Sequence, residues 1–314
     1  MDRKPVSVKS YANIAIVKYW GKADAERMIP STSSVSLTLE NMYTETKLSF
    51  LPEDATGDVM YIDDELQGEK ETIKASKVLD LFRTNPNQHV KIETWNNMPT
   101  AAGLSSSSSG LSALVKAANE LFQVGKTQSE LAQIAKFASG SSSRSFFGPL
   151  AAWDKDSGDV YQVETDLKLA MIMLVLTDQK KPVSSRDGMK LCTETSTSFP
   201  EWIKQSEQDY KDMLGYLKTN DFQAVGELTE ANALRMHQTT STANPPFSYL
   251  TDASYQAMDK VKALRASGEQ CYFTMDAGPN VKVLCLEEDL DRLADHFRKD
   301  YEVIVSRTKE LLDA

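Results

Sequence analysis

A run of serines flanked by glycines is the segment whose residue types most directly suggest chemistry. Residues 99–110 read PTAAGLSSSSSG and lie between a predicted strand that ends near Trp95 and an amphipathic helix that begins near Ser107. The free N–H groups at the start of a helix attract anions, and glycine lets the backbone approach a phosphate closely. A flexible linker is the competing interpretation, but the flanking elements favour a phosphate-binding loop. The loop is neither a Walker A nor a Rossmann loop, because GxxxxGK[ST] and GxGxxG are absent.

Three other segments combine cations with hydroxyl or aromatic groups. Residues 13–22 read NIAIVKYWGK, a predicted strand that ends in two lysines, a phenol and an indole around a glycine. Residues 139–144 read SGSSSR, in which Arg144 can bind a phosphate through two parallel N–H groups. Residues 180–186, KKPVSSR, repeat this chemistry. Each segment also has a structural interpretation, as a core strand, a capped helix end or a solvated face, so none establishes an anion site alone.

The turn at residues 274–280, TMDAGPN, places one aspartate between two predicted strands. An aspartate in a turn most often caps its own backbone. The functional alternative is that Asp276 directs its carboxylate into a cleft between two domains.

The elements that position these groups are mixed in the first half of the chain and richer in helix in the second. A capping box at Thr127 and Glu130 starts one helix. The longest apolar run, residues 167–176, predicts a buried strand close to a domain boundary. The predicted strands cover residues 6–10, 14–18, 44–50, 90–95, 167–176, 270–275, 281–286 and 302–305, and the helical patterns cover residues 70–82, 111–122, 131–138, 202–217, 222–234 and 257–264.

Length and composition limit what the chain can be. Its 314 residues, 41% of them hydrophobic, predict a globular protein of two domains, which we place at residues 1–167 and 168–314. The net charge of −10 argues against a uniform cationic surface for nucleic acid or membranes. The three cysteines form no CxxC pair and suggest neither a disulfide framework nor a zinc site. Because no secretory leader or bilayer-spanning stretch is recognised, we expect a cytoplasmic protein.

Taken together, the motifs resemble those of a known family. The pattern P-x3-G-L-x-S-S resembles the GHMP superfamily of small-molecule kinases, named for galactokinase, homoserine kinase, mevalonate kinase and phosphomevalonate kinase. Within it, residues 13–15, 18–22, 99–104, 139–144 and 276–281 look like those of diphosphomevalonate decarboxylases. The segment YWGK at residues 19–22 is the most specific, because the kinases of the superfamily lack it. Serine stands at several positions where family members often carry alanine or cysteine, namely Ser105, Ser108, Ser142 and Ser143.

The resemblance implies a fold and a reaction. The fold is an α/β (α+β), two-domain GHMP-kinase-like fold, with an N-terminal ribosomal-protein-S5-like domain, a C-terminal ferredoxin-like α+β domain and the active site in the cleft between them. The reaction is the ATP-dependent decarboxylation of (R)-5-diphosphomevalonate to isopentenyl diphosphate, ADP, phosphate and carbon dioxide, in the mevalonate pathway of isoprenoid biosynthesis. It proceeds by phosphorylation of the C3 hydroxyl and uses ATP as co-substrate with Mg²⁺. Members of the family are commonly homodimers, so the resemblance also implies a homodimer; the expectation that it binds no nucleic acid and no membrane comes from the net charge of −10 and the absence of a long apolar run.

The resemblance assigns roles to individual residues. It implies that Asp276 lies near the C3 hydroxyl as base or orienter, that Arg144 binds the substrate and keeps Asp276 ionised, and that Lys18 stabilises the transferring phosphate. Asn13 would orient Asp276 or the substrate carboxylate. The implied substrate-binding residues are Tyr19, Trp20, Gly21, Lys22, Ser139, Gly140, Ser141, Ser142, Ser143, Arg144 and Arg186, and the implied ATP-binding residues are Gly103, Leu104, Ser105, Ser106, Ser107, Ser108 and Asn96, with Ser106 as the Mg²⁺ contact.

Two other functions stay open at this point. One is a kinase of the same superfamily that acts on mevalonate or phosphomevalonate, which would share the ATP loop but release no carbon dioxide. The other is a non-catalytic module that binds a nucleotide or phosphate, against which the presence of Asp276, Arg144 and Lys18 counts.

Overall fold

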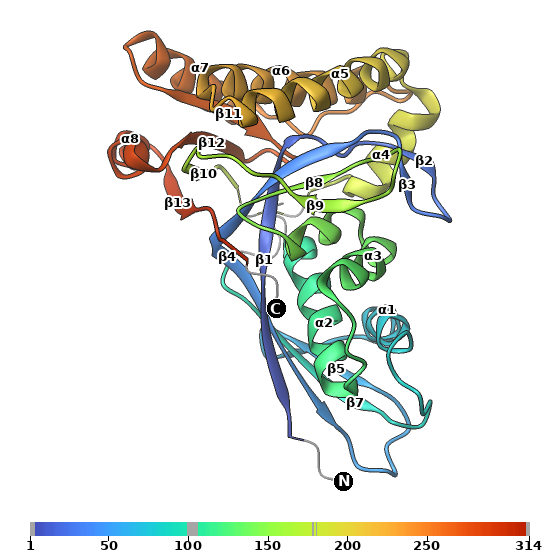
Figure 1. Ribbon diagram of the computed structural model, residues 1–314. Coiled ribbons are helices and arrows are strands. Elements are labelled where there is room, and N and C mark those ends of the chain that lie inside the picture. The colour runs from blue at the N-terminus through green and yellow to red at the C-terminus, as the bar shows by residue number, and fades with distance from the viewer. Residues whose placement is uncertain (1–3, 99–105, 178, 180, 312–314) are drawn as a thin grey trace.

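Two β-sheets with their helices make up the fold, and each sheet is built from one half of the chain (Figure 1). The computed structural model describes residues 4–98, 106–177, 179 and 181–311, without the side chain of Ser106. The first sheet has the strand order β6-β5-β7-β4-β8-β9, and β1 pairs with β4. Its strands are β1 (Val6–Val17), β4 (Ser34–Phe50), β5 (Val59–Ile62), β6 (Glu65–Leu66), β7 (Val90–Asn96), β8 (Leu150–Trp153) and β9 (Val160–Gln162).

Helices of the first half cover one side of this sheet. They are α1 (Glu69–Leu79), α2 (Ser106–Phe122) and α3 (Gln128–Ala138), followed by the 3₁₀ helix η1 (Gly140–Phe146), while β2 (Lys22–Asp24) and β3 (Ile29–Pro30) form a separate short hairpin. The apolar stripes of α2 and α3, which include Val115, Ala118 and Leu131, pack with Ile92 in one buried cluster. The capping box of α3 at Thr127 and Glu130 is present as the sequence predicts.

The second sheet is antiparallel and has the order β11-β12-β10-β13. Its strands are β10 (Leu169–Val175), β11 (Cys271–Met275), β12 (Val281–Leu286) and β13 (Glu302–Arg307), and the helices of this half are α4 (Ser185–Thr195), α5 (Phe199–Lys218), α6 (Phe222–Ser241), α7 (Asp252–Ala266), the 3₁₀ helix η2 (Glu287–Asp289) and α8 (Leu290–Phe297). Figure 1 shows α5, α6 and α7 together at the top of the molecule, over β11 and β12. All helices found in the described ranges are too short or too polar to cross a membrane.

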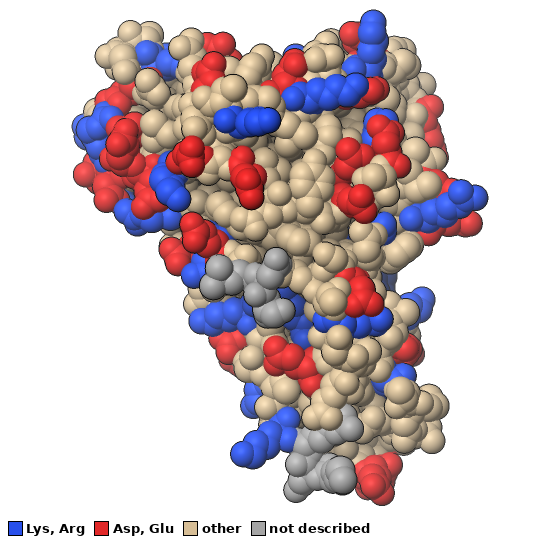
Figure 2. Space-filling model, viewed as in Figure 1, with Lys and Arg blue, Asp and Glu red and all other residues tan. Residues whose placement is uncertain are grey.

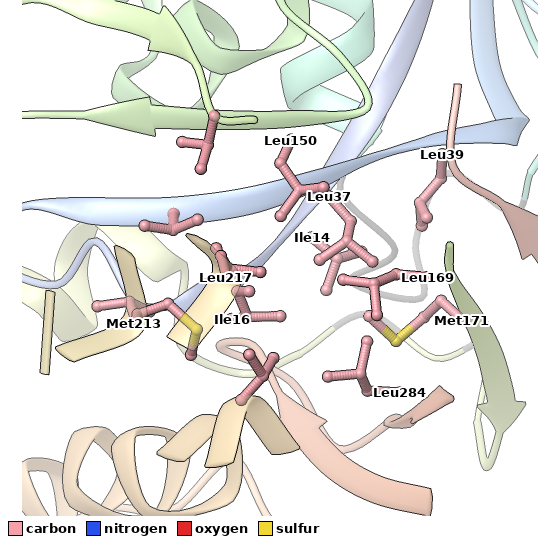
Figure 3. Packing of buried hydrophobic residues seen from close by; sticks show 14 of the residues in the cluster. Ile14, Ile16, Leu37, Leu39, Leu150, Leu169, Met171, Met213, Leu217 and Leu284 are labelled. Atoms are coloured by element: carbon pink, nitrogen blue, oxygen red, sulfur yellow. The ribbon is translucent and has the colours of Figure 1, made fainter. Parts of the chain in front are cut away.

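The two halves share one apolar core. Ile14 and Leu37 of the first sheet pack with Leu169, Met171 and Leu284 of the second (Figure 3). On β10, Leu169 and Met171 belong to this cluster, whereas Ala170 and Ile172 belong to the cluster under α7 and α8. Because β10 is buried on both faces, its sequence is a continuous apolar run instead of an alternating one. The strands of the two sheets occupy residues 6–162 and 169–307, which supports our proposal of two domains at residues 1–167 and 168–314.

Several elements differ from the sequence prediction. Two strands were expected at residues 6–10 and 14–18, but residues 6–17 form the single strand β1, whose register shifts between Tyr11 and Asn13, and Lys18 follows its end. The first half of β4, from Ser34, was not predicted, although its polar and apolar residues alternate as in a strand; in the structure both sets are buried. The structural alternative for residues 139–144 was a capped helix end and a loop. Ser139 is the C-cap of α3, but residues 140–144 belong to η1 instead of a loop, and its buried side chains fix its conformation.

The last described residues return to the first half of the chain. Thr308 forms an isolated bridge with Leu39, and Leu311 forms one with Gly148. The backbone N–H of Lys309 donates to the carbonyl of Thr38 over 2.8 Å. Residues 308–311 therefore fasten the C-terminal half to β4 and to the segment before β8.

We expect Gly148→Ala to loosen this fastening and to lower the free energy of unfolding by about 1–3 kcal/mol, as overpacking usually does. A Cβ at residue 148 would lie 2.1 Å from the backbone oxygen of Lys309, which cannot rotate away as a side chain can. Urea unfolding measures the loss. Gly215→Ala is the matched control, because no atom lies within 4 Å of its Cβ and alanine favours the helix α5. Equal stability changes in the two variants would contradict the prediction.

Candidate active site

A cleft of about 490 Å³ lies where the two halves of the chain meet. It is lined by Asn13, Ala15, Lys18, Tyr19, Trp20, Lys22, Met28, Ser107, Leu111, Phe137, Ala138, Ser139, Gly140, Ser141, Arg144, Lys181, Ser185, Arg186, Met189, Met236, Asp276 and Ala277. Among these described residues, five are cationic and only Asp276 is anionic. A cationic cleft in a chain of net charge −10 concentrates attraction for an anionic ligand at one place.

Helices of the second half hold the segment that follows β1. The backbone N–H of Lys18 donates to Asn232 of α6 over 2.8 Å, and Trp20 donates its indole N–H to Thr239 of α6 over 2.9 Å. Trp202 of α5 donates its own indole N–H to the Trp20 carbonyl over 2.9 Å. Gly21 then turns the chain with φ +112°, a conformation that L side chains rarely adopt. The indole of Trp20 is therefore engaged in the core, and its position fixes that of Lys18.

Asp276 lies between two buried lysines. Lys18 Nζ contacts Asp276 Oδ1 at 2.8 Å, and Lys282 Nζ contacts Oδ2 at 3.0 Å. The aspartate side chain still exposes 23% of its area, whereas the lysines expose 2% and 1%. Burial raises the pKa of the Asp276 carboxyl, but the two lysines outweigh burial and hold that pKa far below its ordinary value. The carboxylate is thus ionised at neutral pH and open to the cleft on one side.

The pKa of Lys18 is also lowered, but for a different reason. Burial lowers its pKa to about 8, although the Asp276 carboxylate acts to raise it. Its Nζ also donates to the carbonyl of Ala15 over 2.7 Å. Lys18 is therefore a cation that can lose its proton just above neutral pH.

Arg144 presents a cation with neutral partners only. Its guanidinium donates to Ser34 Oγ over 2.6 Å and to Ser36 Oγ over 3.0 Å, both on β4. No carboxylate in the described part of the chain forms an ion pair with it. Burial lowers the pKa of Arg144 to about 10, so it keeps its charge at neutral pH. The family resemblance implies that Arg144 keeps Asp276 ionised, but in the structure the ion-pair contacts that maintain this state come from Lys18 and Lys282.

Asn13 has a free acceptor beside these groups. Its Nδ2 donates to Ser145 Oγ over 2.8 Å and to the Ser141 carbonyl over 2.9 Å. Its buried Oδ1 has no hydrogen-bond partner among the described residues. A buried polar atom without a partner is costly, so this oxygen is suited to a ligand donor.

Of the serines in residues 139–144, only some reach the cleft. Ser139 and Ser141 line it, whereas Ser142 and Ser143 are fully buried and turned inward; Ser143 donates to the Gly140 carbonyl over 2.8 Å. Gly140 is required for close packing, because a Cβ there would lie 2.9 Å from the Tyr19 ring. Burial raises the pKa of the Tyr19 phenol to about 12, so the phenol stays a neutral hydrogen-bond donor.

The predicted ATP-binding residues are only partly placed. Gly103, Leu104 and Ser105 lie outside the described residues, as does Lys180, and Ser106 is described only as the first residue of α2. Ser107 is exposed and lines the cleft, and Ser108 is buried. Asn96 does not line the cleft: its Oδ1 accepts from Thr44 over 2.7 Å, and its Nδ2 lies 3.4 Å from Asp63.

Two lysines near Asp276 carried little or no signal in the sequence. Lys282 was not singled out, although it is the one charged residue in the strand VKVLCL. Lys181 belonged to a segment that reads as a solvated lysine pair, yet its Nζ donates to Ser185 Oγ over 2.6 Å and to the Ala277 carbonyl over 2.7 Å. A charged residue inside an apolar strand is a usable signal for a buried ion pair, whereas the contacts of Lys181 depend on the fold.

The fold and the cleft define a class of protein. They are those of proteins with the two-domain GHMP-kinase-like fold, in which the side chains that can bind phosphate lie between the domains. Residues 10–163 match the family model described as the diphosphomevalonate decarboxylase-like N-terminal domain. Residues 171–312 match that of the mevalonate 5-diphosphate decarboxylase C-terminal domain. The chain belongs to the diphosphomevalonate decarboxylase family.

Similar proteins agree with this assignment. The structure of mevalonate pyrophosphate decarboxylase from Streptococcus pyogenes is 66% identical, with a TM-score of 0.97 over 100% of this chain and 99% of the other. The structure of MDDEF in complex with MVAPP, AMPPCP and magnesium is 39% identical, with a TM-score of 0.90 over 99% and 100% of the two chains. A curated diphosphomevalonate decarboxylase from Candida albicans is 30% identical over 94% of this chain and 88% of its own length.

Proposed function

We propose that the protein catalyses the ATP-dependent decarboxylation of (R)-5-diphosphomevalonate to isopentenyl diphosphate, ADP, phosphate and carbon dioxide. The observation that carries the proposal is the meeting of an ionised Asp276 with Arg144, a buried cation that has only neutral partners, in one cationic cleft. A diphosphate, a carboxylate and a triphosphate repel one another, so bringing them together requires such a surplus of positive charge. The complex of a 39% identical protein with MVAPP, AMPPCP and magnesium supports the same substrates here.

The cationic side of the cleft is suited to the diphosphomevalonate. We assign the diphosphate to side chains and backbone of the two walls, namely Tyr19, Lys22, Ser139, Gly140, Ser141 and Arg186, all of which line the cleft. Arg144 then binds the substrate carboxylate or diphosphate through its planar fork. Trp20 and Gly21 contribute by holding the backbone of the substrate-binding segment in place. Ser142 and Ser143 contribute by fixing the conformation of η1, since their side chains are buried.

Asp276 orients the C3 hydroxyl instead of deprotonating it in advance. A tertiary alcohol is far less acidic than a carboxylic acid, and the two lysines lower the pKa of Asp276 further. The carboxylate therefore accepts a hydrogen bond from the hydroxyl and takes up its proton only late in phosphoryl transfer, which depends mainly on positioning and charge. Asn13 orients the reacting groups through its free Oδ1.

We assign the ATP site to the N-terminal end of α2. Ser107 lines the cleft there, and the N–H groups of the first turn favour phosphate, so we assign the ATP phosphates to residues 103–108. The described residues contain no cluster of three or more acidic, histidine or cysteine ligands. This fits Mg²⁺, which usually takes phosphate oxygens, water and one or two protein oxygens; Ser106 is the proposed protein contact. Bound there, Mg²⁺ would neutralise charge on the phosphates.

The bond changes follow from this placement. The γ-phosphoryl group moves from ATP to the C3 oxygen, and Lys18 stabilises its charge. The C3–O bond then breaks and phosphate leaves with the bonding electrons. The C1–C2 bond electrons form the new double bond between C2 and C3, and C1 leaves as carbon dioxide.

Incubation with ATP, Mg²⁺ and diphosphomevalonate tests this function. We expect carbon dioxide, phosphate and ADP in equal amounts together with isopentenyl diphosphate. A superfamily kinase would give ADP and a phosphorylated product without carbon dioxide. A non-catalytic module would bind ATP without consuming it, and either outcome would reject the proposal.

We expect kcat to fall as the pH rises through about 8, because Lys18 loses its charge there. A lysine is a cation below its pKa and neutral above it, so the alkaline side of the pH profile reports its deprotonation. Lys18→Arg moves this limb to higher pH, since a guanidinium keeps its proton. Lys9→Arg is the control at a half-exposed lysine that pairs with Glu45 and should keep the limb near pH 8. If the alkaline limb of the kcat profile stayed at the same pH in Lys18→Arg, the limb would report the titration of another group.

We also propose that the protein acts in the cytoplasm as a homodimer and binds no nucleic acid. On the face shown in Figure 2, basic and acidic side chains of the described residues are interspersed without a continuous basic area. The net charge of −10 supports the same proposal. Sedimentation equilibrium at several concentrations tests the dimer, and a single species of 34.9 kDa would reject it.

A further inference from the structure

Lys282 is a buried cation behind the wall of the cleft. It lies on β12 beside Val281 and Val283, which point into the cluster under α7 and α8. Successive residues of a strand face opposite sides, so Lys282 faces the shared core of the two halves with Leu284. Its register partners are Met173 on β10 and Thr274 on β11. An ammonium group therefore stands on a sheet face that is otherwise used for apolar packing.

The partner of this ammonium is the Asp276 carboxylate. Lys282 Nζ lies 3.0 Å from Oδ2, and within the described ranges neither atom has a well-aligned hydrogen bond, so the contact is an ion pair. The other carboxylate oxygen of Asp276, Oδ1, forms an ion pair with Lys18. Lys282 does not line the cleft, so it acts on the reacting groups through its contact with Asp276 and its repulsion of the Lys18 charge.

Stability does not require a buried ion pair between Lys282 and Asp276 in this place. Burying an ammonium group is costly, and replacing a whole buried ion pair by apolar residues of similar volume is often neutral or stabilising, whereas removing only one partner is destabilising. A methionine at residue 282 would match Met173 and Leu284 around it. The benefit of Lys282 is therefore to be sought in what it does to Asp276.

We propose that Lys282 is a positioning residue for the decarboxylation, acting as the permanent counter-ion of Asp276 so that Lys18 can turn its charge to the transferring phosphate. This inference rests on the proposed function, in which Lys18 and Asp276 act on the reacting groups. If Lys18 were the sole partner, its movement toward the phosphate would leave a carboxylate uncompensated. With Oδ2 held by Lys282, the carboxylate keeps its charge and its plane while Oδ1 stays available to the hydroxyl.

Other charged groups around Asp276 do not replace Lys282. Arg144 of η1 and Lys181 before α4 interact with Asp276 electrostatically, and neither forms an ion pair with it within the described residues. His237 of α6 is buried, and burial first, then the charge of Lys18, lowers its pKa to about 4, so it is neutral. Lys18 and Lys282 are the two groups in ion-pair contact.

Lys282→Met, compared with Lys282→Arg and Lys116→Met, tests the inference. Lys116 is a matched control because it is also a buried lysine, but it donates to Ser10 Oγ and the Ser145 carbonyl and has no acidic partner in the described residues. We expect Lys282→Met to lower kcat by about 100-fold, as misplacement of a reacting group by a fraction of its size can do, with both KM values within about threefold of wild type. Lys282→Arg should recover part of kcat, and Lys116→Met should keep kcat near wild type.

The pH profile separates positioning from a merely structural role. Lys282 repels the charge on Lys18, so its removal should raise the pKa of Lys18 and move the alkaline limb of kcat above pH 8. The pKa of Asp276 should rise toward its ordinary range, as measured by carbon-13 NMR of the carboxyl group. Removing one partner of a buried ion pair is destabilising, so Lys282→Met should be less stable than wild type, and urea unfolding defines the conditions in which the variant is folded for the kinetic measurements.

Two results would overturn the inference. One is a folded Lys282→Met with wild-type kcat and an unmoved limb; the other is an unchanged carboxyl titration of Asp276. Failure of the proposed function is a separate outcome, seen when the wild-type protein releases no carbon dioxide from diphosphomevalonate. The NMR titration still decides in that case whether Lys282 controls Asp276.

Discussion

Asp276→Asn lowers kcat by about 10³-fold while diphosphomevalonate and ATP still bind. The amide keeps the shape of the side chain but loses the negative charge that orients the C3 hydroxyl and accepts its proton. It also leaves Lys18 and Lys282 without their shared counter-ion. Single-turnover measurement of carbon dioxide release, together with calorimetric binding of both ligands, measures the effect.

The matched control is Asp58→Asn. Asp58 is another buried aspartate, held by Arg83 at 2.6 Å, and it does not line the cleft. Its replacement should lower stability without lowering kcat per folded molecule. If Asp276→Asn kept a kcat within tenfold of wild type, the carboxylate would not act on the reacting groups.

Arg144→Gln lowers kcat/KM. The loss corresponds to about 2–5 kcal/mol of transition-state stabilisation, as is usual when a buried charged contact is removed. The guanidinium has Ser34 and Ser36 as neutral partners, so its charge is available to the substrate. Steady-state kinetics with both substrates measure the loss. Arg144→Lys should restore little, because an ammonium cannot bind a carboxylate or diphosphate with two parallel N–H groups.

Arg83→Gln is the control for this variant. Arg83 is also buried, but Asp58 and Asp80 neutralise it. Its replacement should cost stability and leave kcat/KM of the folded enzyme unchanged. Equal losses of kcat/KM in the two variants would show that Arg144 matters only for folding.

The segments that line the cleft can be recognised in the sequence. The contacts that hold these segments in place cannot. Runs of small and cationic residues around Lys18, Arg144 and Asp276 stand out because phosphate chemistry needs few residue types. The helices that hold these runs contribute through single side chains, such as Asn232 and Thr239 of α6. Nothing in their local sequence distinguishes them from other polar residues of a helix, so their role depends on tertiary structure.

Element prediction succeeded where a pattern is local. The capping box of α3 and the apolar run of β10 are of this kind. It missed the first half of β4, although Ser34, Ser36 and Thr38 alternate there with Val35, Leu37 and Leu39 as in a strand. What the alternation does not reveal is that Ser34 and Ser36 are buried and accept hydrogen bonds from the Arg144 guanidinium.

The return of residues 308–311 to β4 and Gly148 has a consequence for the order of events on the ribosome. The first half of the nascent chain emerges early, but the strand segment at Leu39 finds its bridge partner Thr308 only when translation has passed that codon. Until then a backbone edge and the apolar face under it stay exposed, and such surfaces are recognised by chaperones and prone to aggregation. Premature termination a few codons before residue 308 should therefore yield a polypeptide that is retained by chaperones although it carries every residue of the cleft.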